Sequence, residues 1–365
     1  MKKPLGLVLA LLCLSGCARP LHARQLEELQ PVQTLGYDAV PGTVTVSVSD
    51  RKSAQGEDAV RMAARGESLV RACEELQNFT ARGELFFAHV RFALAGEAAA
   101  KAGLSQLLDW FTRSAQARLR LPLFLVRGGS ARELVTGSED DAYEITALLS
   151  ALEEQTRRRG ELCCWTVLDI LRALNEHGAA LCCALEPREA GENAPSAEEG
   201  ALTALAAGYG VLKGDRLCGW LDPAEARGAT ILLNRAGEIS YTLPDGDALA
   251  VVTLRSIKTH WERRGEGRAR VEAEAGLTAL WAPGELTPSP LAALEAALSE
   301  RIGAECAAAL RASRDLGADF LGLGLTEAAL RSLDDRVTVR VRITQSYDSK
   351  AGPVKKEAVA YGYGK

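Results

Sequence analysis

The chain has 365 residues, 47% of them hydrophobic and only 5% aromatic, which provides apolar material for one large core or for two to three ordinary ones. The formal net charge is −5, so bulk electrostatics argue against nucleic acid as a partner. The apolar runs are too short for a transmembrane helix, which needs about twenty apolar residues.

The first predicted element is an export signal. Lys2 and Lys3 precede an apolar block at residues 5–14, which has the length of a signal-peptide core. Leu14-Ser15-Gly16-Cys17 follows and resembles the lipobox of bacterial lipoproteins. We therefore expect residues 1–16 to be removed as a leader and Cys17 to carry a diacylglycerol anchor, with no other cofactor. A plain secretory signal is the alternative, and loss of the leader would move the charge to about −7.

Residues 17–188 are predicted to form an N-terminal α/β region of one or two subdomains. Alternation of apolar residues predicts strands at 42–48, 60–64, 84–93, 122–126 and 179–185. Helical spacing predicts a helix capped by Ser68, one apolar helix stripe over 98–115, and helices at 130–135, 143–154 and 167–174, the last closed by Gly178.

The best domain boundary is the polar stretch at 186–200, and residues 189–203 are predicted as the linker. A hairpin is expected around Lys213-Gly214-Asp215, followed by a helix with Asp222, Pro223 and Glu225 at N-cap, N1 and N3. Long strands at 248–261 and 268–281, a helix from Pro290 and a strand at 337–343 complete the pattern. Residues 204–350 are thus predicted as an antiparallel sheet with a long helix, and 351–365 as a tail.

The predicted fold class is α+β, multi-domain, with mixed or antiparallel sheets flanked by helices in about three subdomains. Few residues point to catalysis or metal binding. The four histidines are far apart, and His89 is expected to be a structural histidine inside a strand. Seven cysteines outside the leader and Cys17 are predicted as buried thiols, not as a metal site.

Two carboxylates leave an enzymatic alternative open. Glu97 and Asp109 could flank a cleft of a hydrolase, but an exposed ion pair of Asp109 with Arg113 is favoured. Arg118 could bind phosphate or solvate a helix end. Gly322 and Gly324 are interpreted as turn or packing glycines, since the dinucleotide-binding context of strand, loop and helix is missing.

Several motifs, in the correct order from the lipobox to about residue 345, resemble the Ger(x)C family, the lipoprotein C subunits of spore germinant receptors. Near the mature start, residues 25–38 resemble a family segment that ends in a short strand and an L-G-x-D turn. Matches between 89 and 135 are His89, Gly96, Glu97, Gly103, Leu108, Asp109, Arg113, Arg118, Ala131 and Glu133. Matches to a later hallmark are Lys213, Asp215, Leu217, Gly219, Leu221, Glu225, Arg227 and Gly228, and then Ala318, Asp319, Gly322 and Gly324.

The resemblance implies three parts made of sheets with flanking helices, and no catalytic activity. It implies a lipid-anchored subunit on the outer face of the spore inner membrane, beside membrane-embedded A and B subunits, with the motif residues in structural or interaction roles. Two departures are a short stretch between the late glycines and the last strand, and a tail without a family pattern. A solute-binding lipoprotein is the main alternative, although the long antiparallel hairpin argues against it.

Overall fold

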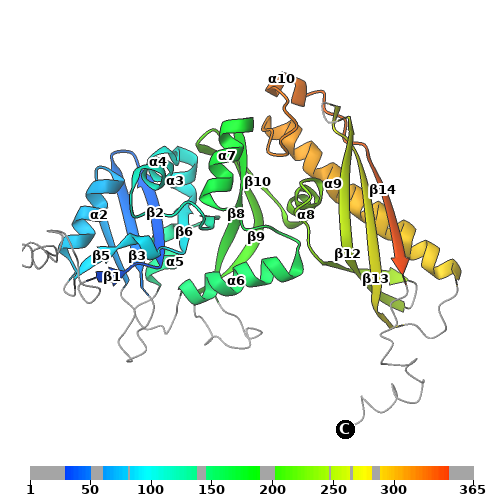
Figure 1. The fold of residues 1–365 in the computed structure, drawn as a ribbon, viewed down its shortest axis with the longest axis horizontal. Coiled ribbons are helices and arrows are strands. Elements are labelled where there is room, and N and C mark those ends of the chain that lie inside the picture. The colour runs from blue at the N-terminus through cyan, green and yellow to red at the C-terminus, as the bar shows by residue number, and fades with distance from the viewer. Residues whose placement is uncertain are drawn as a thin grey trace, which may run out of the picture.

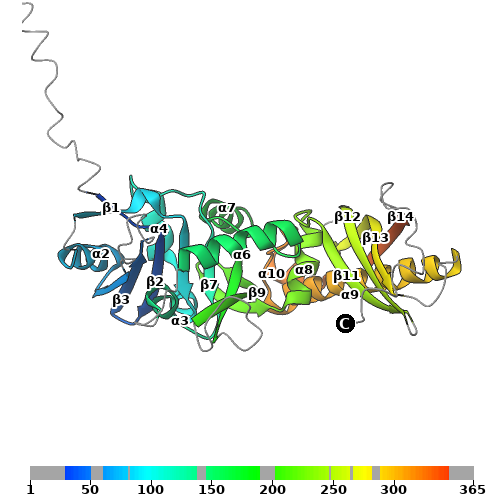
Figure 2. The same ribbon diagram turned by 90° about the horizontal axis from the view of Figure 1, so that it is seen from below.

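The computed structural model describes residues 29–50, 61–80, 83–137, 145–189, 202–245, 248–263, 266–281 and 288–344. These residues form an elongated molecule, with an eight-stranded sheet toward one end and a four-stranded sheet beside a long helix at the other (Figures 1 and 2). The predicted α+β, multi-domain class is confirmed.

The eight-stranded sheet has four parallel central strands, with an antiparallel pair added on each side. Its strands, in spatial order, are β10 (Arg216–Leu221), β9 (Leu202–Lys213), β8 (Ala179–Glu189), β7 (Leu123–Val126), β6 (Phe92–Gly96), β2 (Thr34–Val40), β3 (Thr43–Ser49) and β4 (Arg61–Gly66). A separate two-stranded sheet pairs β1 (Leu29–Pro31) with β5 (Glu84–Phe86) in parallel.

Helices cover both faces of this sheet because both faces are apolar. One face packs against α2 (Leu69–Asn78), α3 (Glu97–Ala102), α4 (Ser105–Arg113) and α7 (Val167–His177). The other face packs against α5 (Ala131–Thr136) and α6 (Ile145–Arg159). The predicted Ser68 cap of α2 is confirmed, since its hydroxyl accepts a hydrogen bond from the backbone N–H of Arg71, and Gly178 closes α7 in the left-handed conformation.

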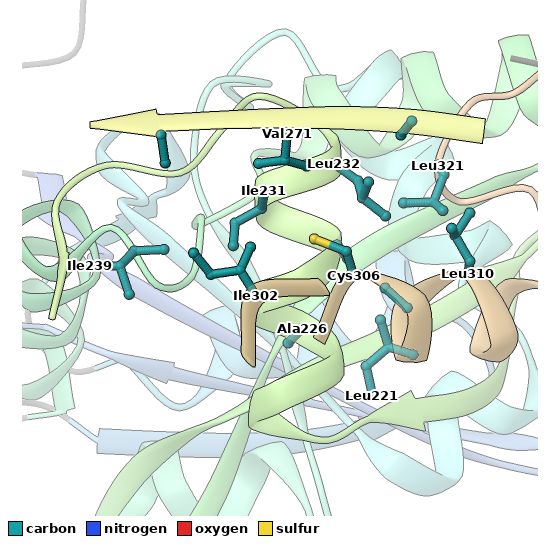
Figure 3. Packing of buried hydrophobic residues seen from close by; sticks show 14 of the residues in the cluster. Leu221, Ala226, Ile231, Leu232, Ile239, Val271, Ile302, Cys306, Leu310 and Leu321 are labelled. Carbon is teal, nitrogen blue, oxygen red and sulfur yellow. The ribbon is translucent and has the colours of Figure 1, made fainter. Parts of the chain in front are cut away.

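The second half contains α8 (Pro223–Leu232), α9 (Pro288–Leu316), the short α10 (Glu327–Leu330) and a sheet in the order β11-β12-β13-β14. Its strands are β11 (Ile239–Asp245), β12 (Ala248–Arg263), β13 (Arg268–Trp281) and β14 (Val337–Thr344). Helices α8 and α9 pack together, and Ile302, Cys306 and Leu310 of α9 face Ile231 and Leu232 in one buried cluster (Figure 3).

Three local predictions are wrong. The strand predicted at 84–93 is interrupted by a 3₁₀ turn at Phe87–His89, because β5 pairs with β1 while β6 joins the larger sheet. The single helix stripe over 98–115 is two helices, since Gly103 adopts a φ of 131° that ends α3. The L-G-x-D segment, residues 35–38, lies inside β2 instead of forming a turn.

Two predictions about the second half also need correction. Strand β14 runs parallel to β13, so the sheet predicted to be antiparallel is mixed. The strands on the two sides of the predicted linker, β8 and β9, pair with each other up to Glu189 and Leu202. The linker therefore joins neighbours in one sheet, and the hairpin expected in the C-terminal region extends the N-terminal sheet.

We expect Gly228→Ala to destabilise the protein. A Cβ at Gly228 would lie 2.0 Å from the backbone oxygen of Glu305, so α8 and α9 would have to separate. Overpacking of this kind costs about 1–3 kcal/mol of unfolding free energy, measurable by urea denaturation. Gly303→Ala on α9 is the control, because its nearest contact is 3.5 Å away. It should be stabilising by roughly 0.5–1 kcal/mol, and equal effects of the two substitutions would contradict the close crossing.

Candidate functional site

The residues that carry the family resemblance fall into three places. One group lies at the carboxyl ends of the parallel strands, a second is exposed on the first half, and a third joins the two halves. Cys17, the predicted lipid site, lies outside the described residues, as does the tail at 351–365.

The first group is organised by Asp38, at the carboxyl end of β2. Its carboxylate accepts hydrogen bonds from the backbone N–H groups of Ala131 and Arg132, at 2.9 and 2.8 Å, and so caps the start of α5. Gly96 is needed beside it, since a Cβ there would lie 2.0 Å from an Asp38 oxygen. Glu133 completes a capping box with Ser130. Burial raises the pKa of Asp38, opposed by the two N–H groups.

Glu97 occupies the neighbouring strand end. Its carboxylate accepts a hydrogen bond from the backbone N–H of Gly128 at 2.5 Å and pairs with Lys101 at 2.6 Å. Burial alone would raise the pKa of Glu97, but the bonds from Lys101, Gly128 and Trp220 together lower it. Ligands of open α/β sheets bind outside the carboxyl ends of parallel strands. Here the chain's own Asp38 and Glu97 take the N–H groups that such a ligand would use.

The second group does not form a site. Asp109 and Arg113 make the favoured exposed ion pair at 2.5 Å on α4, while Glu97 is held by Lys101. The carboxylates of the hydrolase alternative are thus each engaged in a separate pair. The prediction that His89 lies inside a strand is wrong, since His89 is exposed at the end of the 3₁₀ turn. Arg118 is exposed in the loop before β7.

The third group is centred on a buried ion pair between α8 and α9. Arg227 binds Glu305 through two hydrogen bonds, Nε to Oε2 at 2.9 Å and Nη2 to Oε1 at 2.7 Å. The hydroxyl of Tyr241 donates a hydrogen bond to Glu305 at 2.8 Å, and the Arg227 guanidinium lies over the Tyr241 ring. Because Glu305 is only 3% exposed, its charge depends on these partners. Arg227 also reaches Glu161, in the loop before α7, at 3.4 Å.

The pKa values follow from this packing. The hydrogen bond to Glu305 raises the pKa of Arg227 despite burial, so the guanidinium stays charged. Burial, and then the adjacent Glu305 carboxylate, raise the pKa of Tyr241, so its hydroxyl remains protonated and can donate. Neither Arg227 nor Tyr241 therefore changes its protonation state near neutral pH.

Other hallmark residues make further contacts around this ion pair. Lys213 pairs with Glu327 of α10 at 2.7 Å, and a Cβ at Gly219 would meet the Leu316 side chain at 2.5 Å. The carbonyl of Asp215 accepts from the N–H of Leu104 at 2.8 Å. Glu225 completes the predicted capping box of α8 with Asp222. These residues therefore fix helix starts and the positions of adjoining elements.

Asp319 holds the loop that follows α9. Its two carboxylate oxygens accept hydrogen bonds from the backbone N–H groups of Leu323, Gly324 and Leu325, at 2.7, 2.7 and 3.0 Å. Gly322 and Gly324 have φ values of 64° and 75°, which confirms them as turn glycines. Gly322 also lies against His177 of α7, so this loop contacts the first half.

The seven cysteines are all free thiols. Cys182, Cys183 and Cys306 are buried as predicted, whereas Cys218 is exposed and three others are half-buried. Burial raises the pKa of Cys73 to about 12 and of Cys163 to about 11. Among the described residues, no group of three His, Cys, Asp or Glu is arranged to hold a metal ion. No helix in the described ranges is long and apolar enough to span a bilayer.

Sequence reasoning missed Glu305, Glu161 and Tyr241. A signal for Glu305 exists, because it follows Ile302 by three residues and precedes Ala309 by four, which places a carboxylate on the apolar stripe of α9. Such a position predicts a buried charge that needs a partner. The partner itself is 78 residues away and has no local signature.

Two family models match this chain. The model described as "Spore germination protein N-terminal domain" matches residues 22–186, and the one described as "Spore germination B3/ GerAC like, C-terminal" matches residues 207–331. The crystal structure of the GerBC protein has a similar fold, with a TM-score of 0.53 and 12% identity over 85% of this chain and 97% of that chain. No curated protein matches the chain.

We expect Arg227→Ala to destabilise the protein strongly, since it leaves the buried Glu305 carboxylate without its main partner. Breaking a buried pair from one side costs about 3–5 kcal/mol, which urea denaturation would measure. Arg113→Ala is the control, because its pair with Asp109 is exposed to solvent and contributes little to stability. Comparable losses in the two variants would show that the Arg227 pair has no special role.

Proposed function

The chain belongs to the Ger(x)C family of spore germination proteins, and on that premise we propose that it works as the non-enzymatic, lipid-anchored C subunit of a nutrient germinant receptor. The observation that carries the proposal is the ordered match of both family models, which together cover residues 22–186 and 207–331. The region between them contains the polar stretch, residues 189–203, that the sequence predicts as a linker.

The arrangement of the motif residues supports a role in assembly. Asp38 and Glu97 occupy the strand ends where an α/β enzyme would bind its substrate. Arg227, Gly228 and Asp319 hold neighbouring elements together. A chain that uses its shared residues in this way suits a rigid subunit that acts through contacts with other proteins.

The proposed location is the outer face of the spore inner membrane. Cys17 ends a lipobox-like segment, and a diacylated cysteine would hold the chain at the bilayer more persistently than a single acyl chain. There the protein would assemble with membrane-embedded A and B subunits and contribute to nutrient-triggered germination.

The anchor is tested by Cys17→Ser, followed by fractionation of spore membranes. The variant should leave the membrane fraction or be mislocalised while the protein keeps its fold, because the thiol that takes the lipid is missing. Cys13→Ser is a matched control, since Cys13 lies in the part of the leader that would be discarded. Normal membrane retention of the Cys17 variant would reject the lipid anchor, whatever the partners are.

Assembly is tested separately by crosslinking in dormant spores and identification of the captured chains. We expect A and B subunits among them, and we expect spores that lack the gene to lose the response to at least one nutrient. Deletion spores that germinate normally on every nutrient would contradict the receptor role even if the anchor is confirmed.

A further inference from the structure

Four of the seven free cysteines lie close together, where the loop between α6 and α7 packs against β8. Cys163 and Cys164 belong to this loop, and Cys182 and Cys183 are consecutive on the strand. Consecutive strand residues point to opposite faces of a sheet, so the two strand cysteines enter different buried clusters. Cys164 packs against the cluster that contains Cys183, and the two thiols share a hydrogen bond. One thiol of the loop therefore meets one thiol of the strand.

The other two cysteines have different surroundings. The thiol of Cys182 donates a hydrogen bond to the carbonyl of Leu123 at 2.9 Å, in the cluster on the opposite face of the sheet. The backbone N–H of Cys163 donates to the Tyr209 hydroxyl at 2.6 Å, and burial raises the pKa of the Cys163 thiol to about 11. Cys163 and Cys182 are thus matched controls for the neighbours that follow them in the sequence.

Cys164 and Cys183 differ in how readily they ionise. The hydrogen bond with Cys183 lowers the pKa of Cys164 against the effect of burial, and the Thr156 hydroxyl, 3.2 Å from the Cys164 sulfur, acts in the same direction. The hydrogen bond to Cys164 and burial raise the pKa of Cys183 well above its ordinary value. Cys164 is half-buried, whereas Cys183 is fully buried. Because the thiolate is the nucleophilic form of cysteine, Cys164 is the reactive member of the pair and Cys183 is its protonated neighbour.

We propose that Cys164 and Cys183 form a reactive dithiol, which hydrogen peroxide converts to a disulfide. The Cys164 thiolate attacks one peroxide oxygen and becomes a sulfenic acid, while the O–O bond breaks and the other oxygen leaves as hydroxide. The Cys183 sulfur then attacks the sulfenic sulfur, which forms the S–S bond and releases water. The two sulfurs lose two electrons, and the peroxide, with the proton that Cys164 gave up on ionising, becomes two molecules of water.

The bond would tie the α6–α7 loop to an interior strand of the eight-stranded sheet. Glu161 belongs to the same loop and pairs with Arg227 of α8 at 3.4 Å. Oxidation would therefore restrain the loop that forms the first-half side of the Arg227 contact. The dithiol does not depend on the lipid anchor or on the proposed receptor role.

The experiment uses the full chain with Cys13→Ser and Cys17→Ser, so that only the seven cysteines of the described residues remain. The reduced, folded protein is treated with hydrogen peroxide, blocked with N-ethylmaleimide and digested without reductant, and linked peptides are identified by mass spectrometry. We expect one linked pair, Cys164 with Cys183, and the loss of two titratable thiols. Linkage through other cysteines, or none at all, would overturn the proposal.

Single substitutions separate the two roles. Cys183→Ser should stop at the sulfenic acid of Cys164, which dimedone traps, whereas Cys164→Ser should give neither a sulfenic acid nor a disulfide. Cys163→Ser and Cys182→Ser are the controls and should form the bond as the parent chain does. A folded Cys164→Ser variant that still oxidises Cys183 would show that Cys164 is not the attacking thiol and would overturn the assignment.

A measurement on the unsubstituted pair keeps the test decisive if either variant fails to fold by circular dichroism. Iodoacetamide should alkylate Cys164 of the native protein more than about tenfold faster than Cys163, since both thiols are half-buried and only that of Cys164 has a lowered pKa. Equal rates at the two neighbouring thiols would overturn the proposal.

Discussion

The structure depends on the contact between Arg227 and Glu305 at the point where α8 crosses α9. A buried ion pair repays its desolvation only when the geometry is good and the remaining oxygens are bonded, and here two bonds from Arg227 and one from Tyr241 meet that condition. The pair can form only because Gly228 lets the two backbones approach. Since a shift of either helix would separate the buried Glu305 carboxylate from Arg227, this contact fixes one register of α8 against α9. Glu161 extends the same network to the first half of the chain.

The two halves of the chain also share a buried cluster and hydrogen bonds. The buried cluster around α8 and α9 includes Ala179, Leu181 and Tyr209 from strands of the eight-stranded sheet. The hydroxyl of Tyr209 accepts a hydrogen bond from the N–H of Cys163 and also bonds Thr230 of α8, so one buried side chain links both sides. The division between the two family models therefore falls within a paired sheet, and β9 and β10 carry the chain from the first core into the second.

Local features of this fold could be predicted from sequence, whereas its long-range pairings could not. The capping box of Asp222 and Glu225, the Ser68 cap and the turn at Gly178 are set by neighbours a few residues away, and all three agree with the structure. The direction of β14 and the break at Phe87–His89 depend on which strand lies alongside, and periodicity carries no information about that. The polar composition of residues 189–203 could not show that the strands on their two sides pair with each other. For the candidate site, the family likeness selected Arg227 and Gly228, while their partner Glu305 required the three-dimensional contact.

The hydrogen bonds at the carboxyl ends of the parallel strands show what two of the motif carboxylates do in this fold. At the carboxyl ends of β2 and β6, Asp38 and Glu97 occupy the N–H groups of Ala131, Arg132 and Gly128, so the usual ligand position of an α/β sheet is filled from within. These hydrogen bonds fix the start of α5 and the loop at Gly128 against the strand ends, so the residues contribute to the structure of the first half. Arg227 has the corresponding role between the two halves, since it contacts both Glu305 of α9 and Glu161 in the loop before α7.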